Sequence, residues 1–265
     1  MAIKINTLSA HALFMHIHLL GTNGWFDTET GQTPCILIDS QEEYVILDAG
    51  NGIRKMDSYI TDTKKPILLL LSHFHIDHSA GLHILPKFAF PQGMTILGQP
   101  GTKRTLSRLV KSPFMAPLEL FRKDMQVDVR DLRIGKNRFG PLNIETLPLI
   151  HKDPCFGFSF SLEGKKIAYC TDTGVCENLA KLAKNADLLI SECSWRVRNQ
   201  IPDWPHLAPE DAADIAKKAG AKKLILTHFD AVQYPKRSDR IEAQKKARKI
   251  FPNTFAGEDD MEIEL

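Results

Sequence analysis

The chain has 265 residues, of which 43% are hydrophobic and 25% are charged. This length supports a sizeable core, and we expect residues 1–265 to form one α/β domain rather than two packed halves. The formal net charge of +2 is too small a bias to indicate a nucleic-acid-binding protein, so global charge leaves the substrate open.

Hydrophobic periodicity predicts strands and helices that alternate along the whole chain. In the first half, the predicted strands span residues 13–20, 34–39, 43–48, 66–71 and 94–98. The predicted helices of this half span 52–61 and 101–111, and a further helix opens near Ser79. In the second half, the predicted strands span 142–150, 155–161, 166–171, 187–191 and 223–227. The predicted helices there span 176–184, 208–219 and 236–249.

A histidine-rich loop follows the strand predicted at 66–71. It reads His73-Phe-His75-Ile-Asp77-His78, which puts three imidazoles and one carboxylate within six residues. Imidazole nitrogen and carboxylate oxygen suit Zn²⁺ and neighbouring transition ions, and ligands this crowded serve two ions more readily than one. The alternative is an exposed turn that happens to be rich in histidine. That alternative fits poorly, because the whole chain has only ten histidines.

Three later segments end in residues of the same kind. His151, Asp172 and His228 each directly follow a predicted strand. Such a residue presents its side chain at the rim of a sheet, where ligands from distant segments can converge. A single histidine at a rim is more often a capped surface residue. All three together with the loop predict one shared metal site.

With these residues in place, the chain resembles the metallo-β-lactamase superfamily. The resemblance rests on the loop at 73–78, His151, the turn from Thr171 to Gly174, and His228, and it extends from about residue 19 to about residue 230. It implies a four-layer αββα sandwich, an α+β or α/β fold in which two sheets pack face to face with helices outside. It further implies that His73, His75 and His151 hold one metal ion, that Asp77, His78 and His228 hold a second, and that Asp172 bridges them.

Two neighbouring metal ions favour hydrolysis on physical grounds. Cations about 3.5–4 Å apart lower the pKa of a shared water and neutralise charge that builds on the attacked group. The expected nucleophile is then a water or hydroxide that bridges the ions, which agrees with the lack of a G-x-S-x-G motif in the sequence. We therefore expect a metal-dependent hydrolase with two divalent metal ions as cofactors. Zn²⁺ is the first candidate, and Mn²⁺ and Fe²⁺ stay open.

A further histidine, His206, precedes the helix predicted at 208–219. Its surroundings resemble the His-Ser-Thr region of ribonuclease Z-like phosphodiesterases, although Leu-Ala follows His206 in this chain. The resemblance implies that His206 stabilises or protonates a departing alkoxide. We therefore name His206, together with Asp77, as catalytic. The alternative is a solvent-exposed histidine near the start of a helix.

Two departures from ribonuclease Z bear on the substrate. The stretch after Leu20-Gly-Thr22 lacks the Arg-Asn element expected there, and residues 88–138 contain no long Gly/Pro-rich arm for tRNA. The basic residues of the second stretch read as the solvated face of one predicted helix: Lys103, Arg104, Arg108 and Lys111.

These departures favour a small-molecule substrate, a small or cyclic phosphodiester, over nucleic acid. Ribonuclease Z-type RNA processing stays open as an alternative. So does hydrolysis of a lactone or thioester, which would use the same metals without His206. The complete ligand set argues against a non-catalytic scaffold, and His75 argues against an oxygen-reducing di-iron protein, whose relatives tend to have a carboxylate there. Whether the chain forms a homodimer also stays open.

Nothing in the sequence predicts export or a membrane anchor. Residues 1–12 contain no apolar run long enough for a secretion signal, and no other segment approaches a membrane span. Five scattered cysteines without a CxxC pair read as buried, reduced thiols. We therefore expect a cytoplasmic protein with no membrane partner.

Two further sets of residues are expected near the site. By resemblance, Asp48 supports the metal loop from beneath, so we expect it to bond a ligating histidine. Large side chains near the predicted mouth are candidates for shaping the pocket, although anchoring a loop is their default role. They are Trp25, Phe26, Phe114, Met115 and Trp204.

Overall fold

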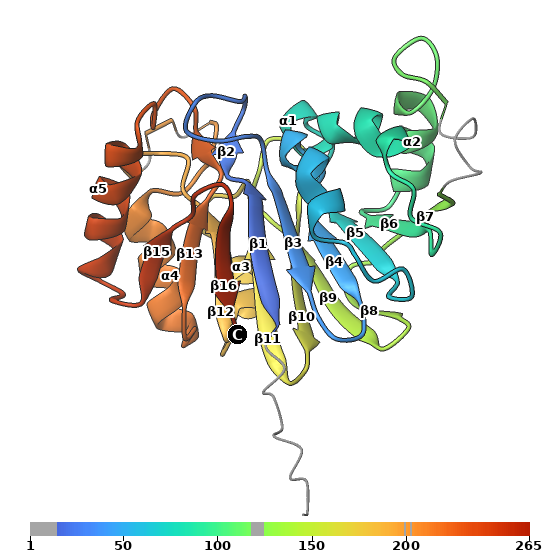
Figure 1. The fold of residues 1–265 in the computed structure, drawn as a ribbon. Helices are drawn as coiled ribbons and strands as arrows, with labels where there is room; N and C mark the ends of the chain where they lie inside the picture. Colours follow the sequence, from blue (N-terminus) through green and yellow to red (C-terminus); the bar gives the residue numbers. More distant parts are fainter. Residues whose placement is uncertain (1–14, 118–124, 199, 202) are drawn as a thin grey trace, which may run out of the picture.

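The computed structural model describes residues 15–117, 125–198, 200–201 and 203–265. One of its two large sheets has seven strands in the order β16, β1, β3, β4, β5, β6, β7 (Figure 1). The bounds of these strands are His16–Gly21 for β1, Cys35–Asp39 for β3, Tyr44–Leu47 for β4, Ile67–Leu71 for β5, Met94–Gly98 for β6, Val127–Asp131 for β7 and Met261–Glu264 for β16.

The other large sheet also has seven strands, in the order β15, β13, β12, β11, β10, β9, β8. Their bounds are Gly135–Phe139 for β8, Leu142–Pro148 for β9, Phe156–Leu162 for β10, Lys165–Cys170 for β11, Leu188–Glu192 for β12, Leu224–Thr227 for β13 and Thr254–Ala256 for β15. A separate small sheet pairs β2 (Asn23–Gly24) with β14 (Phe229–Asp230) in parallel.

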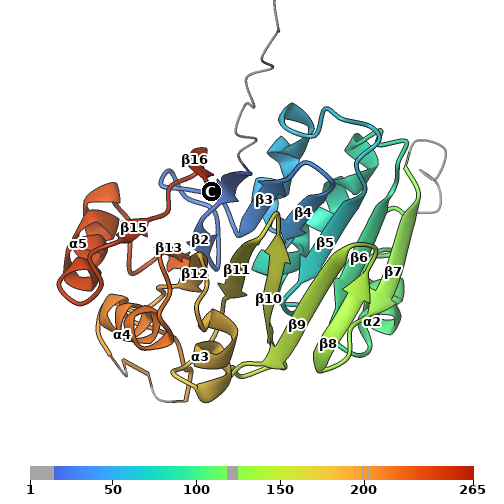
Figure 2. The ribbon, with the colours of Figure 1, turned by 90° about the horizontal axis from the view of Figure 1, so that it is seen from below.

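Helices cover the outer face of each large sheet (Figure 2). The 3₁₀ helices η1 (Asn51–Ser58) and η2 (Ala80–Lys87) and the α-helix α2 (Thr102–Leu109) pack on the first sheet. The α-helices on the second sheet are α3 (Glu177–Ala183), α4 (Pro209–Ala219) and α5 (Arg237–Arg248). A single turn of helix, α1 (Ile76–Ser79), lies within the histidine-rich loop.

Three hydrophobic clusters define the layers. The first lies between the sheets and joins residues such as Leu19 and Ile36 to Phe158 and Ile225. The second lies between the second sheet and its helices, and the third between the first sheet and its helices. Helix, sheet, sheet and helix therefore follow one another, which confirms the four-layer αββα sandwich of the metallo-β-lactamase type.

The apolar run of β5 shows how sequence encodes this layering. Leu68 and Leu70 face the cluster between the sheets, while Ile67, Leu69 and Leu71 face the helices. Because alternate side chains of a strand point to opposite faces, a strand buried on both faces needs an unbroken apolar run. The strand ends where the first polar side chains of the histidine-rich loop follow.

The strand directions bring the loop and the later rim residues to one edge of the sandwich. Strands β11, β12 and β13 run parallel, and β9 runs parallel to them because it pairs antiparallel with β10, which pairs antiparallel with β11. His151, Asp172 and His228 therefore leave the same edge. Asp172 and His228 have left-handed backbone angles, with φ of 49° and 51°. Asp and His tolerate this conformation better than most residues do.

The main differences from the predicted elements lie at the sheet edges. Strands β7, β8, β15 and β16 were not predicted. Strands β7 and β8 alternate polar exposed and half-buried residues, and β15 and β16 are short, so their apolar signal is weak. The helix predicted at 52–61 is a 3₁₀ helix that ends at Ser58. Residues 13–14 of the first predicted strand lie outside the described residues.

Among the described residues, no helix combines the length and the apolar content that a membrane span requires.

Candidate metal centre

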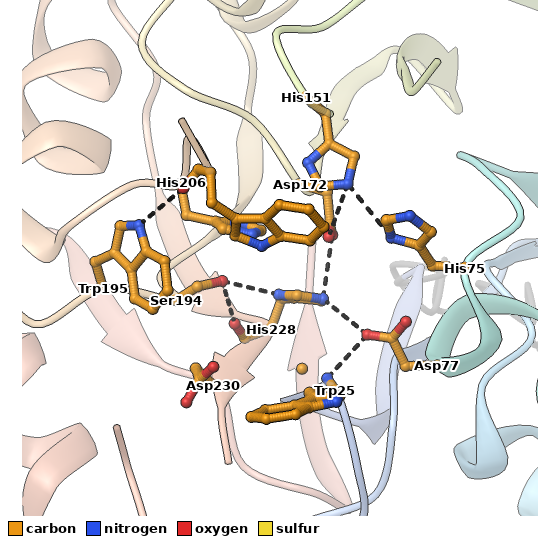
Figure 3. Close-up of a pocket in the computed structure, with 12 residues that line it drawn as sticks. Trp25, His75, Asp77, His151, Asp172, Ser194, Trp195, His206, His228 and Asp230 are labelled. Carbon is orange, nitrogen blue, oxygen red and sulfur yellow. Dashed lines mark hydrogen bonds and ion pairs between the residues drawn. The ribbon is translucent and has the colours of Figure 1, made fainter. Parts of the chain in front are cut away.

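Five of the seven predicted ligands line one cavity of about 370 Å³ at the rim where the strands end, and the buried rings of His73 and His78 pack beside them. Figure 3 places His75 and His151 on one side of Asp172, and His228 and Asp77 on the other. Their candidate ligand atoms form two groups. The members of the groups are His73, His75, His151 and Asp172 in the first, and Asp77, His78 and His228 in the second.

The first group is an arrangement of imidazole nitrogens around one carboxylate oxygen. Nε2 of His151 is 3.4 Å from Nδ1 of His75. Oδ2 of Asp172 is 3.8 Å from Nε2 of His73 and 3.9 Å from Nε2 of His151. Nε2 of His73 is buried and has no hydrogen-bond partner among the described residues. Leaving such an atom unsatisfied is costly, and a bound cation would satisfy it.

The second group brings two imidazoles close together. Nε2 of His78 is 3.0 Å from Nε2 of His228, and each is 3.1 Å from Oδ1 of Asp172. Oδ2 of Asp77 is 3.3 Å from Nε2 of His228. Gly24 permits this packing, because a Cβ there would lie 2.5 Å from the His228 ring. Asp172 thus offers one oxygen to each group, and the nitrogen and oxygen donors fit a pair of divalent transition ions.

Hydrogen bonds behind the second group hold its rings in place. Buried Asp48 accepts hydrogen bonds from Nδ1 of His78 at 2.8 Å, from the backbone N–H and hydroxyl of Ser72 at 2.7 and 2.8 Å, and from the Tyr169 hydroxyl at 2.7 Å. This confirms the predicted contact of Asp48 with a histidine of the loop. Nδ1 of His228 bonds the Ser194 hydroxyl at 2.9 Å. Such partners orient an imidazole and fix which nitrogen faces a metal.

One hydrogen-bond partner of the first group is exposed to solvent. Nε2 of His75 bonds Oδ2 of Asp153 at 2.8 Å, and the Asp153 side chain is 62% exposed. Nδ1 of His73 bonds the Ser72 hydroxyl at 3.0 Å. Nδ1 of His151 is buried without a hydrogen-bond partner among the described residues.

The electrostatic environment of the two groups also differs. Burial, reinforced by the neighbouring histidines, holds the pKa of His73 well below its usual value. Burial also disfavours the charged form of His78, but Asp172, Asp77 and Asp48 outweigh it and hold the pKa of His78 well above its usual value. Burial opposes ionisation of Asp172, yet the adjacent His228, His78 and His73 keep the pKa of its carboxyl well below its usual range.

His206 lines the same cavity and is held by a residue that the sequence analysis missed. Nδ1 of His206 lies 2.8 Å from Oε1 of the fully buried Glu192. Glu192 also accepts the backbone N–H groups of Thr173, Ser194 and Leu207. Burial disfavours a charged His206, but Glu192 outweighs it and raises the pKa of the imidazole to about 9. The signal was available, since Glu192 ends an apolar strand just as Asp172 follows one.

The aromatic candidates separate into two sets. Trp25 and Trp204 line the cavity, and the ring of Phe26 packs edge-on against that of Trp25. Phe114 instead lines a different cavity beside α2, and Met115 packs against the cluster under the first sheet. The expectation that these residues lie near the mouth is therefore wrong for Phe114 and Met115, because both follow α2 and lie with it on the outer side of the first sheet.

The sandwich and the clustered histidines and carboxylates together define a protein of the metallo-β-lactamase fold. A family model described as a β-lactamase superfamily domain matches residues 43–229, and the chain belongs to this superfamily. Among curated relatives, ribonuclease Z of Agathobacter rectalis is 25% identical over 95% of this chain and 98% of the relative. Ribonuclease Z of Archaeoglobus fulgidus is also 25% identical, over 96% of this chain and 98% of the relative.

Solved structures agree on the fold. The metallo-β-lactamase fold protein YhfI from Bacillus subtilis superposes with a TM-score of 0.78 at 22% identity, over 95% of this chain and 99% of that one. The short form of human tRNase Z gives a TM-score of 0.71 at 22% identity, over 94% and 98%. The family and these relatives make the chain a metal-dependent hydrolase.

Proposed function

We propose that this protein is a two-metal phosphodiesterase that cleaves RNA. The observation that carries the proposal is the pairing of His206 with buried Glu192 in the cavity that holds the candidate ligands. Curated relatives named ribonuclease Z, similar along almost the whole chain, support RNA as the substrate. They favour the alternative of the sequence analysis over its first expectation, a small or cyclic phosphodiester.

The two groups would hold the two ions, for which Zn²⁺ remains the first candidate. The first ion would bind His73, His75 and His151, and the second would bind Asp77, His78 and His228. Asp172 offers Oδ1 to one group and Oδ2 to the other, so it would bridge them. When bound, divalent ions supply Lewis acidity that activates water and neutralises charge on a phosphate.

His206 would supply the proton that an alkoxide leaving group needs. Glu192 holds Nδ1 of His206, so Nε2 is the nitrogen left to donate to the departing oxygen. The His206 ring centroid lies 5.4 Å from that of His151 and 6.1 Å from that of His228, which puts it beside both ligand groups. Asp77 would contribute by holding an ion, and its Oδ2 also accepts the backbone N–H of Trp25 at 2.8 Å.

A small phosphodiester is the second candidate, and a difference in length favours it. The alignment with the Agathobacter relative spans 309 positions, more than the 265 residues of this chain, so that relative has segments without counterpart here. A ribonuclease that uses such segments to bind a large RNA would bind that RNA less tightly without them. The cavity of about 370 Å³ suits a group of roughly nucleotide size.

The direct test offers the metal-loaded protein three substrates: an RNA with a 3′ extension, a cyclic nucleotide and a lactone. Cleavage of the RNA with the highest kcat/KM supports the proposal. Preference for the cyclic nucleotide selects the second candidate, and activity on the lactone alone overturns both.

The His206→Ala variant tests the proton donor. Its turnover should fall by roughly 10²–10⁴-fold for a phosphodiester with an alkoxide leaving group, and by much less for p-nitrophenolate, which departs without a proton. The metal content should not change. His83→Ala, which removes an exposed histidine on η2 that belongs to neither group of ligands, is the matched control and should leave both rates intact. Equal losses on both substrates would refute the role of His206.

A further inference from the structure

Exposed apolar side chains lie next to the candidate ligands, in the sequence or in the cavity. Ile76 lies between two loop residues that are candidate ligands, and Ile150 directly precedes His151; both are exposed. Trp25 and Trp204 line the cavity itself and are 65% and 39% exposed. An exposed indole is costly in water, and large apolar residues that cluster around one cavity mark a binding surface.

Trp25 is held in a conformation that its own chemistry disfavours. Its φ of 75° lies in the left-handed region, which a bulky residue rarely adopts. The surrounding loop enforces it. The backbone N–H of Trp25 donates to Asp77, and buried Arg240 donates to Thr22 and Asn23 just before the turn. Strain of this kind persists where a structure over-determines it, commonly at functional sites. Figure 3 shows the indole beside Asp77 and His228.

Trp204 occupies the other side of the ligand set. Its ring is parallel to that of His75, with centroids 6.2 Å apart and an interplanar angle of 3°, and it meets His151 edge-on at 5.8 Å. The backbone carbonyl of Trp204 accepts a hydrogen bond from the indole N–H of Trp195 at 3.3 Å. One exposed indole therefore flanks each group of candidate ligands.

We propose that Trp25 and Trp204 are stacking platforms for the two bases on either side of the scissile phosphate. This inference rests on the proposed phosphodiesterase function and adds a substrate class to it: unpaired, single-stranded nucleotides. A phosphate at the ligand groups would carry one nucleotide toward each indole. Aromatic side chains stack on any base, each contributing roughly 5- to 150-fold in affinity. Bases inside a duplex are already stacked and paired, so they cannot use these platforms without unpairing.

The test crosses two variants with three substrates. The substrates are a single-stranded dinucleotide with both bases and two analogues, each abasic on one side of the phosphate. Trp25→Ala and Trp204→Ala should each lower kcat/KM on the complete dinucleotide by roughly 5- to 150-fold. On one of the abasic analogues Trp25→Ala should show no loss of kcat/KM, and on the other analogue Trp204→Ala should show none. Phe114→Ala removes a ring that is 73% exposed and lines another cavity, so it should change none of the rates.

Losses that are equal on all three substrates, or no loss on the complete dinucleotide, would overturn the platforms. If wild-type protein hydrolyses none of the substrates, the proposed function is wrong. The proposal that Trp25 and Trp204 stack on bases is then tested by a binding measurement. Tryptophan fluorescence should then be quenched by a single-stranded hexanucleotide more strongly than by its duplex, and the quenching should fall in both variants. Quenching that survives in both variants, or that is absent in wild type, counts against the platforms. Thermal unfolding of each variant checks that the fold is retained.

Discussion

The two groups of candidate ligands lie side by side, but His78 of the second group and His75 of the first are supported in opposite ways. His78, in the second group, bonds Asp48, which is buried and accepts three further hydrogen bonds. His75, in the first group, bonds Asp153, whose side chain lies mostly in solvent. A buried, fully bonded carboxylate fixes a ring more firmly than an exposed one does, because the exposed one exchanges freely with water. We expect the second group to bind its ion more tightly than the first.

The largest effect should come from the residue that the groups share. Asp172→Ala removes an oxygen from each group, so the metal content should fall and activity should drop by more than the roughly 10–100-fold typical of a residue behind a ligand. Metal analysis after gel filtration and initial rates measure both. Asp230→Ala is the control, since Asp230 lines the cavity without belonging to either group. Unchanged metal content in Asp172→Ala would rule out a bridging role.

Asp48→Asn should have the next largest effect. Asn tolerates the left-handed backbone of this position, where φ is 58°, but its NH₂ group cannot accept the hydrogen bonds that Asp48 accepts. The free energy of unfolding should fall by about 1–3 kcal/mol, and the affinity of the tighter ion by about 10–100-fold. Denaturant unfolding and metal titration measure these changes. Tyr169→Phe removes one of the four hydrogen bonds and should cost less; an equal or larger cost would contradict this assignment.

Proton release should distinguish the groups as well. The raised pKa of His78 means that metal-free protein carries a proton there near pH 7, which a metal ion must displace. The affinity of the second group should therefore rise with pH, by about tenfold per unit for each proton released. The lowered pKa values of His73 and His151 leave those rings neutral, so the first group should show little change between pH 7 and 8. Calorimetry at several pH values measures both slopes; identical slopes would contradict the difference.

The smallest effect is expected for Asp153→Asn. Its bond to His75 is replaceable by water, so the affinity of the weaker ion should fall by about tenfold or less, at the low end for a partner behind a ligand. Stability should stay unchanged because the side chain is exposed. Asp128→Asn, at an exposed position on β7, controls for the loss of surface charge. A loss of affinity as large as that in Asp48→Asn would contradict the proposed difference in support between the two groups.

Strands and site residues that are marked by an abrupt change of residue type along the chain were mostly predicted from the sequence. The unbroken apolar run of β5 followed by His73 marks a buried strand that ends at polar side chains. The same signal identified Asp172 and His228, and it was present but not used at Glu192. Edge strands such as β8 escaped prediction because half of their side chains face solvent, which weakens the apolar signal.

Contacts between segments that lie far apart in the sequence could not be predicted, because no local residue pattern marks them. Tyr169 lies on β11, far along the chain from Asp48, and only the packing of the two sheets brings its hydroxyl within 2.7 Å. The backbone N–H of Trp25 that bonds Asp77 is a group that every residue except proline carries. Nothing in the sequence distinguishes Asp153 from other exposed acidic residues, and only the fold places it beside His75. Such partners become visible only once the tertiary structure is known.

Stepwise calorimetric titration of metal-free wild-type protein with Zn²⁺ tests the central claim most directly. Two binding events should appear, one ion each per chain. The tighter event should weaken in Asp48→Asn and the weaker event in Asp153→Asn. A single event of one ion per chain, or two events that both variants weaken alike, would contradict a paired centre whose halves are unequally supported.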